Sequence, residues 1–146
     1  MKDSADNIPR VFLDTNILMD YVLFRTDEAL AIEHIFDSSM DLRLSLHIAA
    51  HSLTNLFYVL RKEFTAAERN LLIQNLCALC KVVPVSGENI EKAIASGYTS
   101  DLEDALQIQG AVESDCDYFI TRDHELFEKC PFRTLLPHEL IRELSL

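Results

Sequence analysis

The sequence predicts an α/β fold in which a central, mostly parallel sheet of four to five strands lies between two layers of helices. Short apolar segments expected to be strands alternate with longer amphipathic segments expected to be helices, an order that is typical of a parallel sheet. The chain has 146 residues and a hydrophobic content of 49%, which suit a globular protein with one core. Residues 1–146 are therefore expected to form a single domain, with a flexible segment over residues 1–8.

Strands are expected where short apolar segments end in turn residues. They cover residues 10–14, 42–46, 82–85 and 117–121, and residues 133–136 are expected to add an edge strand. Helices are expected over residues 16–22, 28–36, 48–60, 66–80, 87–95 and 101–112, and from Pro137 onward. Their expected start and stop signals are an N-cap at Asp27, capping boxes at Thr65–Glu68 and Ser100–Glu103, an N-cap at Ser86 and a C-terminal Gly97.

The first expected strand ends in an abrupt polar break. Apolar residues through Leu13 are followed by Asp14, Thr15 and Asn16, which are small polar residues that favour turns and helix N-caps. Asp14 therefore stands at the carboxyl end of a core strand, where ligands and metals bind in open α/β sheets. Because burying a lone carboxylate is very costly, Asp14 must be solvated, paired or metal-bound.

Further acidic residues are expected at the same edge of the sheet. Asp123 follows the last core strand, and Asp101 and Asp104 open a helix on one of its faces. Glu103 is expected to point about 100° away from Asp104 and to serve the capping box. Each residue alone fits an ordinary turn or helix-cap role. Together they need a cation to coexist, and oxygen ligands suit Mg²⁺ or Mn²⁺.

A carboxylate site of this kind can activate water and stabilise the charge that develops during phosphodiester cleavage. The chain has 3 glycines, too few for a Gly-rich phosphate loop, and no serine lies in a nucleophile elbow. A phosphatase that uses Asp14 as a nucleophile is a weaker alternative. The haloacid-dehalogenase-type motif has a second Asp two residues later, where this chain has Asn16.

Three segments, in order over nearly the whole chain, carry a family resemblance: Val11–Asp20 (VFLDTNILMD), Asp101–Gln107 (DLEDALQ) and Asp117–Asp123 (DYFITRD). They resemble PIN-domain ribonucleases, especially the small bacterial toxins of the VapC type. The resemblance implies a PIN-like endoribonuclease for single-stranded RNA, with Asp14, Asp104 and Asp123 around Mg²⁺ or Mn²⁺. Asp101 matches an additional acid of the most similar subgroup. The resemblance also implies a small antitoxin protein as partner.

The chain departs from the PIN pattern at Asn55, where many of these nucleases have a glutamate. The amide oxygen can ligate a metal or its water but supplies no charge, and Asp101 could compensate. The net charge of −11, from 13 basic and 24 acidic residues, should also repel nucleic acid unless it is segregated or neutralised. Asn55 and this charge support an alternative, a non-catalytic PIN-like module that binds RNA or protein.

Arg25 and Arg122 flank the expected acidic edge. Their forked donors suit the phosphate oxygens of a nucleic acid, and each could equally be a structural partner of an acid. His47 and His51 stand one turn apart near the start of the helix expected over residues 48–60. Because no third ligand accompanies them, they are expected to be helix-start and surface histidines.

The remaining features concern compartment and assembly. Cys77 and Cys80 form a CxxC within a helix, but Cys116 and Cys130 are not spaced as a second zinc-binding pair, so reduced core cysteines are expected. No apolar run approaches the roughly 20 residues that span a bilayer, and the start of the chain is polar, so a cytoplasmic protein without membrane contact is expected. The apolar helices over residues 48–60 and 66–80 are expected to be shared in a homodimer.

Overall fold

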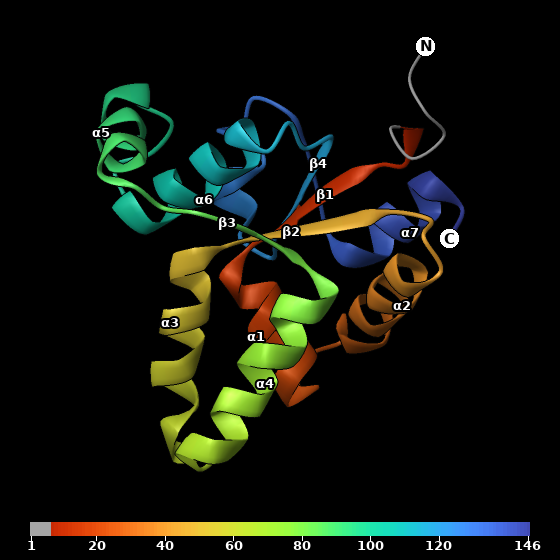
Figure 1. Ribbon diagram of the computed structural model, residues 1–146. Helices are drawn as coiled ribbons and strands as arrows, with labels where there is room; N and C mark the ends of the chain where they lie inside the picture. The colour runs from red at the N-terminus through yellow and green to blue at the C-terminus, as the bar shows by residue number, and fades with distance from the viewer. Residues whose placement is uncertain (1–6) are drawn as a thin grey trace.

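The computed structural model describes residues 7–146, and a five-stranded parallel sheet forms its centre (Figure 1). The strands are β1 (Arg10–Leu13), β2 (Ser45–Ala49), β3 (Lys81–Val83), β4 (Tyr118–Ile120) and β5 (Arg133–Leu135), in the spatial order β3-β2-β1-β4-β5. Each neighbouring pair is parallel, so the predicted α/β class is confirmed. The flexible segment predicted for residues 1–8 falls mostly outside the described residues.

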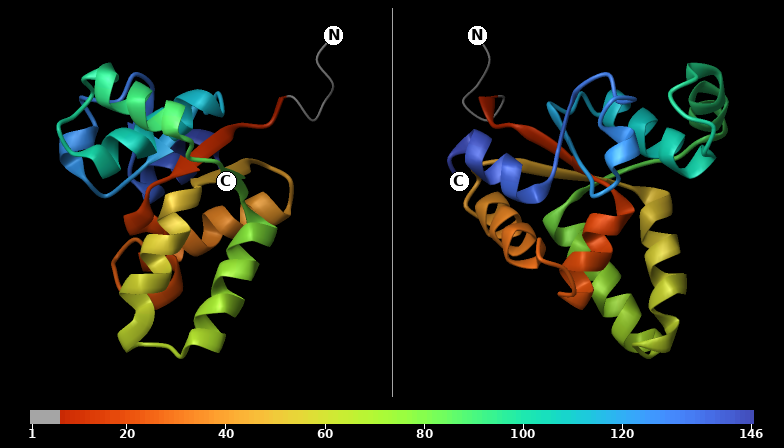
Figure 2. Two further views of the ribbon diagram at one scale, coloured as in Figure 1. Left: turned by 60° about the vertical axis from the view of Figure 1, so that its left-hand side comes forward. Right: turned by 180° about the vertical axis from the view of Figure 1, so that it is seen from behind.

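Helices cover both faces of the sheet and complete the three layers (Figures 1 and 2). On one face lie α5 (Gly87–Ser96) and α6 (Leu102–Glu113). On the other face lie α1 (Thr15–Leu23), α2 (Ala29–Met40), α3 (Ala50–Val59), α4 (Ala66–Leu79) and α7 (Pro137–Leu144). Two short 3-10 turns, η2 (Leu60–Lys62) and η3 (His124–Leu126), follow α3 and β4.

The pleat of the strands divides the core into two clusters. In β1, Val11 and Leu13 point into the larger cluster, which includes residues of α1 to α4 and α7. Phe12 points the other way, into the smaller cluster beneath α6, where its ring stacks on Phe119 with centroids 5.7 Å apart. Because both faces of β1 are covered, the strand is apolar throughout its buried length, as expected of a central parallel strand.

Most of the predicted helix signals are confirmed. The capping box of Thr65 and Glu68 begins α4, and Ser86 caps α5. Gly97 ends α5 with a left-handed φ of 68°, a conformation that glycine adopts without strain. Pro137 occupies the first turn of α7. Two predicted N-caps are wrong by one residue: Glu28 rather than Asp27 precedes α2, and Asp101 rather than Ser100 caps α6.

The predicted boundary between the second strand and the following helix is also wrong. Strand β2 begins at Ser45 and continues to Ala49, because a turn with Leu42 at a φ of 59° follows α2 and delays the strand. His47 is therefore a buried strand residue that is hydrogen-bonded to Ser45, not a helix-start histidine on the surface. His51 lies in the first turn of α3 and is half-buried.

The four cysteines are free, and three of them match the expectation of core positions. Cys80 and Cys116 are buried and Cys130 is partly buried, whereas Cys77 is exposed and is not a core residue. Burial raises the pKa of the Cys80 thiol to about 12, which keeps it protonated and chemically quiet. Within residues 7–146, no helix is both long and apolar enough to cross a membrane.

Helices α3 and α4 form a hairpin that extends away from the sheet (Figure 2). Arg69 of α4 joins the two limbs, because its Nη1 donates to the carbonyl of Phe57 at 2.7 Å and its guanidinium lies over the Phe57 ring. A shallow groove on the hairpin is lined by Leu53, Thr54, Phe57, Asn70 and Ile73.

We predict that Gly110→Ala destabilises the fold, although alanine normally favours a helix by about 1 kcal/mol. An added Cβ would lie 3.0 Å from Cζ of Phe12, and this fully buried ring is held against Phe119 and has little room to retreat. We expect the free energy of unfolding in urea to fall by about 1–2 kcal/mol. Gly87→Ala in α5 is the matched control, because nothing lies within 4 Å of its added Cβ. Equal effects of the two changes would contradict this account of the packing.

Candidate active site

Asp14 connects β1 to α1 at the carboxyl edge of the sheet. Its side chain caps α1 by accepting from the Thr15 amide at 2.7 Å, and it accepts from the Thr121 hydroxyl at 2.8 Å. The residue is only 3% exposed. The Asp14 amide donates to the Ile120 carbonyl at 3.0 Å, which joins the ends of β1 and β4. The carboxylate is thus buried and held by donors from two elements.

Two acids of α6 approach Asp14. Asp14, Glu103 and Asp104 each offer a carboxylate oxygen, and these oxygens all lie within 4.8 Å of one another. Among residues 7–146, no other trio of His, Cys, Asp or Glu lies close enough to hold an ion. The expectation for Glu103 was wrong: because Asp101 is the N-cap, Asp104 takes the N3 position of the helix and Glu103 is free to face Asp14.

A polar network behind the carboxylates fixes Glu103. Its Oε1 accepts from the Thr15 hydroxyl at 3.1 Å and from the Gln107 amide nitrogen at 2.9 Å, and it lies 3.3 Å from Nε2 of His51. The fully buried Gln107 amide nitrogen is also 2.6 Å from the Ser52 hydroxyl and 2.8 Å from that of Thr15. Residues of α1, α3 and α6 therefore meet at this network, which the sequence patterns did not indicate.

Asp123 reaches the same site from the end of β4. Its backbone amide donates to the Thr121 hydroxyl at 3.0 Å, and that hydroxyl donates to Asp14. Asp123 lines a cavity of about 340 Å³ together with Asp14, Thr15, Asn16, Asn55, Tyr58, Val59, Glu103 and Asp104. The structure thus brings together the predicted residues Asp14, Asp104, Asp123 and Asn55, and adds Glu103.

Asp101 stands apart from the predicted group. It is exposed, it caps α6 by accepting from the Asp104 amide at 2.9 Å, and it does not line the cavity. Asp101 and Asp104 were expected to share a helical face. The Asp101 side chain instead turns back over the first turn of the helix, as N-cap residues do.

Arg25 and Arg122 both pair with Asp20, an acid of α1 that is completely buried. Nε of Arg25 lies 3.3 Å from Asp20 Oδ1, and Arg122 contacts both carboxylate oxygens. Neither arginine lines the cavity, although 48% and 33% of their side chains stay exposed. The signal for this pairing was available, because an acid among Ile17, Leu18, Met19 and Val22 needs a partner of opposite charge.

Burial and crowding make the carboxylates of the site hard to ionise together. Burial, and then the neighbouring Glu103 and Asp123, raise the pKa of Asp14 to about 6 against the opposing Thr121 hydrogen bond. Burial, and then the carboxylates of Asp14 and Asp101, raise the pKa of Asp104 to about 7. Burial also raises the pKa of Glu103, but contacts with His51 and the other members of the network outweigh it and hold that pKa below its ordinary value.

The family model for the PIN domain matches residues 10–125. The chain belongs to the PIN-domain family. No curated protein matches the chain in sequence.

Solved structures share the PIN fold at low sequence identity. A chain of the DNA-bound VapBC complex from Salmonella typhimurium has a TM-score of 0.66 at 16% identity, over 89% of this chain and 99% of that one. A chain of a toxin–antitoxin complex from Klebsiella pneumoniae has a TM-score of 0.65 at 19% identity, over 87% of this chain and 97% of that one. VapC20 from Mycobacterium tuberculosis is described as a sarcin–ricin loop cleaving toxin. It has a TM-score of 0.64 at 12% identity, over 81% of this chain and 93% of that one.

The acids of this PIN domain fit a divalent cation. Hard ions such as Mg²⁺ and Mn²⁺ prefer carboxylate oxygens, and Asp14, Glu103 and Asp104 present three of them within 4.8 Å. Burial and the neighbouring acids raise the pKa values of Asp14 and Asp104. A cation between the carboxylates would favour their ionised forms.

We predict that the metal-free PIN domain loses stability as the pH rises from about 4 to about 7. Asp14 has an ordinary pKa of 3.8 and a folded-state pKa of about 6, so between these values the folded chain keeps a proton that the unfolded chain has released. Stability then falls with increasing pH, and Asp104 extends the fall toward pH 7.

Melting curves in EDTA at several pH values measure this dependence. Asp14→Asn should flatten the fall in melting temperature, whereas Asp41→Asn, at an exposed position after α2, should leave it unchanged. Parallel curves for the wild type and Asp14→Asn would contradict the assignment.

Proposed function

We propose that this PIN-domain protein is a metal-dependent endoribonuclease that hydrolyses phosphodiester bonds of single-stranded RNA. The observation that carries the proposal is the cluster of Asp14, Glu103 and Asp104 in a cavity that Asp123 also lines. Carboxylates that crowd one another at the open edge of a parallel sheet lower the stability of the fold, and the same crowding favours the binding of a cation. The description of VapC20, which has the same fold, supports RNA as the substrate.

In this proposal, Asp14, Asp104 and Asp123 hold Mg²⁺ or Mn²⁺, and Glu103 lies within reach as a further ligand. When bound, the ion supplies an activated water and positive charge for the phosphodiester transition state. The chain itself fixes the geometry. Thr121 orients Asp14 through one hydrogen bond, and Gln107 orients Glu103 through another.

The other predicted site residues take supporting roles. Asn55 lies in the cavity wall and can bind substrate or a metal-bound water through its amide oxygen. Asp101 adds negative charge near Asp104 and fixes the first turn of α6. Arg122 and Arg25 keep exposed atoms while paired with Asp20, so each can also meet an RNA phosphate.

We also propose that the protein is the toxin of a cytoplasmic toxin–antitoxin pair and that residues 1–146 act as one PIN-like domain. The VapBC and toxin–antitoxin complexes among the structures of like fold support a small antitoxin as partner. The groove lined by Leu53, Phe57 and Ile73 supports a homodimer, because the half-buried Phe57 and Ile73 leave part of the apolar α3–α4 hairpin exposed.

A PIN-like module that binds RNA or protein without cutting is the second candidate. The uncharged Asn55 in the cavity wall favours it, because it removes one anion from the ligand set. A phosphatase with Asp14 as nucleophile has no support from the geometry. The position where the haloacid-dehalogenase-type motif has its second Asp is occupied by Asn16, whose side-chain amide donates to Asp14 at 3.3 Å and cannot act as a general acid or base.

We predict that Mn²⁺ raises the melting temperature of the wild-type protein. Binding to the folded state alone stabilises it by mass action, so an excess of about a hundredfold over Kd should raise the midpoint by about 5–10 °C. Asp14→Asn should abolish the rise, and Asp41→Asn should preserve it. An unchanged wild-type midpoint across millimolar Mn²⁺ would count against the metal site.

We further predict that Asp104→Asn lowers cleavage of single-stranded RNA by about a hundredfold or more, since a charged ligand is lost while the shape of the side chain is kept. Asp101→Asn is the matched comparison one turn earlier. It also removes one charge, but asparagine caps helices as well as aspartate, and Asp101 lies outside the cavity, so the loss should be much smaller. A wild-type protein that binds RNA but never cuts it with Mg²⁺ or Mn²⁺ would favour the non-catalytic candidate.

A further inference from the structure

Helix α3 is exceptional in the charge distribution of this acidic protein. The chain carries a net charge of −11, yet residues 42–62 contain no Asp or Glu. Among the α-helices of residues 7–146, α3 is the one without an acidic residue. It borders the cavity through Asn55, Tyr58 and Val59. An anionic polymer that reaches the carboxylates therefore meets least repulsion along α3.

Tyr58 is an exposed aromatic side chain in the wall of the cavity. It is 63% exposed, although Cζ of Arg61 lies 4.0 Å from the centroid of its ring. Nη1 of Arg61 also donates to the Tyr58 carbonyl at 2.9 Å, which fixes the guanidinium against the ring. One face of the ring is therefore covered by a cation, and the exposed remainder of the side chain borders the cavity.

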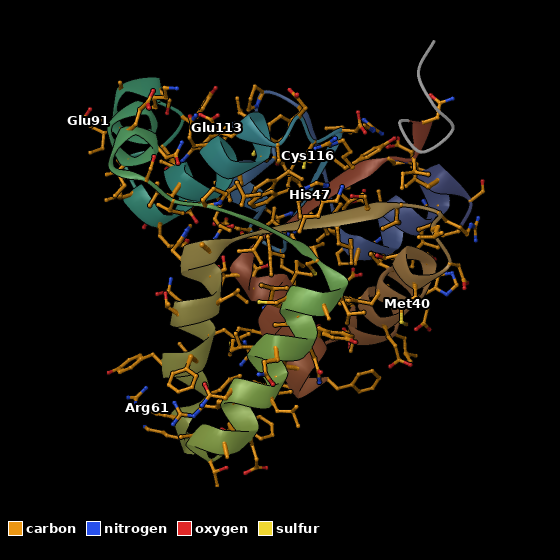
Figure 3. The ribbon with its side chains drawn as sticks, viewed as in Figure 1. Met40, His47, Arg61, Glu91, Glu113 and Cys116 are labelled. Atoms are coloured by element: carbon orange, nitrogen blue, oxygen red, sulfur yellow. The ribbon has the colours of Figure 1, made fainter. Side chains whose placement is uncertain are left out.

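The neighbouring pair of Phe57 and Arg69 is an arginine–aromatic contact with a structural role, and it serves as a comparison. Arg69 reaches from α4 to α3, lies 4.1 Å from the Phe57 ring centroid, and is half-buried between the limbs of the hairpin. Arg61 connects no second element. It comes from the turn directly after α3 and is exposed (Figure 3). The Tyr58–Arg61 pair thus holds an exposed ring in place without joining parts of the fold.

The spacing of Asn55, Tyr58 and Arg61 makes a row that leads away from the carboxylates. Residues three apart lie on one side of a helix, and Arg61 follows in the 3-10 turn η2 that continues directly from α3. Arg61 marks the outer end of this row near the tip of the hairpin, whereas Glu91 and Glu113 lie in the α5–α6 layer (Figure 3). The row offers an amide, an aromatic ring and a cation in order.

We propose that Tyr58 is a stacking platform for a base of single-stranded RNA, with Arg61 placed to meet the adjoining phosphate. The inference rests on the proposed function and adds a substrate subsite to it. Aromatic rings bind single-stranded nucleic acid because every base has a π-face, and an arginine beside the ring adds charge attraction. The ring is held in place before RNA arrives, so less conformational entropy is lost on binding.

The chain contains no tryptophan, so a single introduced tryptophan reports on one site. In an Asp104→Asn background, which slows cleavage, Tyr58→Trp should be quenched when a short uridine oligoribonucleotide is added. Phe24→Trp is the matched control, because Phe24 is a 52% exposed aromatic at the end of α1 and does not line the cavity. Quenching at position 58 and none at position 24 is the expected result.

Affinity gives a second readout in the same background. Tyr58→Ala should weaken binding of the oligoribonucleotide by about five- to a hundredfold, the range for loss of one stacked base. Tyr58→Phe should keep the affinity, Phe24→Ala should not change it, and the Mn²⁺-induced rise in melting temperature should survive Tyr58→Ala in the otherwise wild-type chain.

Equal quenching at positions 58 and 24, or an unchanged affinity of Tyr58→Ala, would overturn the platform. A change in solution mass on Tyr58→Ala would overturn it as well, because it would assign this face to a protein partner. These measurements distinguish failure of the proposed base stacking on Tyr58 from failure of the proposed nuclease activity. If the wild type cuts RNA and Tyr58→Ala cuts it with unchanged KM, the platform alone fails. If position 58 is quenched selectively but wild type with Mn²⁺ never cuts, the nuclease alone fails.

Discussion

The burial of the Asp14 carboxylate at the end of β1 is the constraint on which the rest of the site depends. A carboxylate that is 3% exposed needs donors or a cation, and the donors here come from two directions. Thr15 supplies its backbone amide, and Thr121 supplies its hydroxyl from the end of β4. Because Thr121 also accepts from the Asp123 amide, the same chain of bonds that holds Asp14 places Asp123 beside it. The parallel pairing of β1 and β4 brings these groups together.

The two residues after Asp14 connect the site to the remaining elements. The Thr15 hydroxyl meets Ser52 of α3 and both Glu103 and Gln107 of α6. The Asn16 side chain turns toward β4, where its oxygen accepts from the Arg122 amide and its nitrogen lies 3.3 Å from the Thr121 hydroxyl. The run Asp14-Thr15-Asn16 is therefore a connected unit rather than a turn with one functional acid.

Much of this arrangement could be predicted from the sequence. The alternation of strands and helices fixes the parallel sheet, and a parallel sheet brings strand ends to one edge, which is why Asp14 and Asp123 could be placed together. Glu103 was missed for a specific reason. The segment from Ser100 to Asp104 contains two overlapping capping patterns, Ser100 with Glu103 and Asp101 with Asp104. The choice of N-cap decides whether Glu103 or Asp104 takes the N3 position and which acid is free to face Asp14. Local sequence rules rate Ser100 and Asp101 as equally good caps.

Contacts between distant segments were the other source of error. Arg25 follows Asp20 by 5 residues, but Arg122 lies 102 positions from Asp20, so spacing along the chain gives no sign of this second partner. His47 was assigned to a helix because the apolar run through Ile48 and Ala49 fits a buried strand and a buried helix equally well. The neighbouring strands resolve this ambiguity, because β1 pairs with residues 45–47 and β3 pairs with residues 47–49.

Helix α3 faces a different environment on each of three sides, and these environments explain its composition. At 100° per residue, Ser52 and Leu56 face the interior, where both are completely buried. Leu53 and Phe57 lie on a second side, in the groove of the hairpin. Asn55 and Tyr58 lie on a third side, in the cavity with the carboxylates.

An acid would be unfavourable on any of these sides of α3. It would be desolvated in the interior, would expose charge on an apolar groove, or would add repulsion beside Asp14 and Asp104. The glutamate that many PIN nucleases have at the position of Asn55 adds this repulsion, and the neutral Asn55 of this chain avoids it. The protein can then carry its excess negative charge elsewhere and keep one neutral approach to the site.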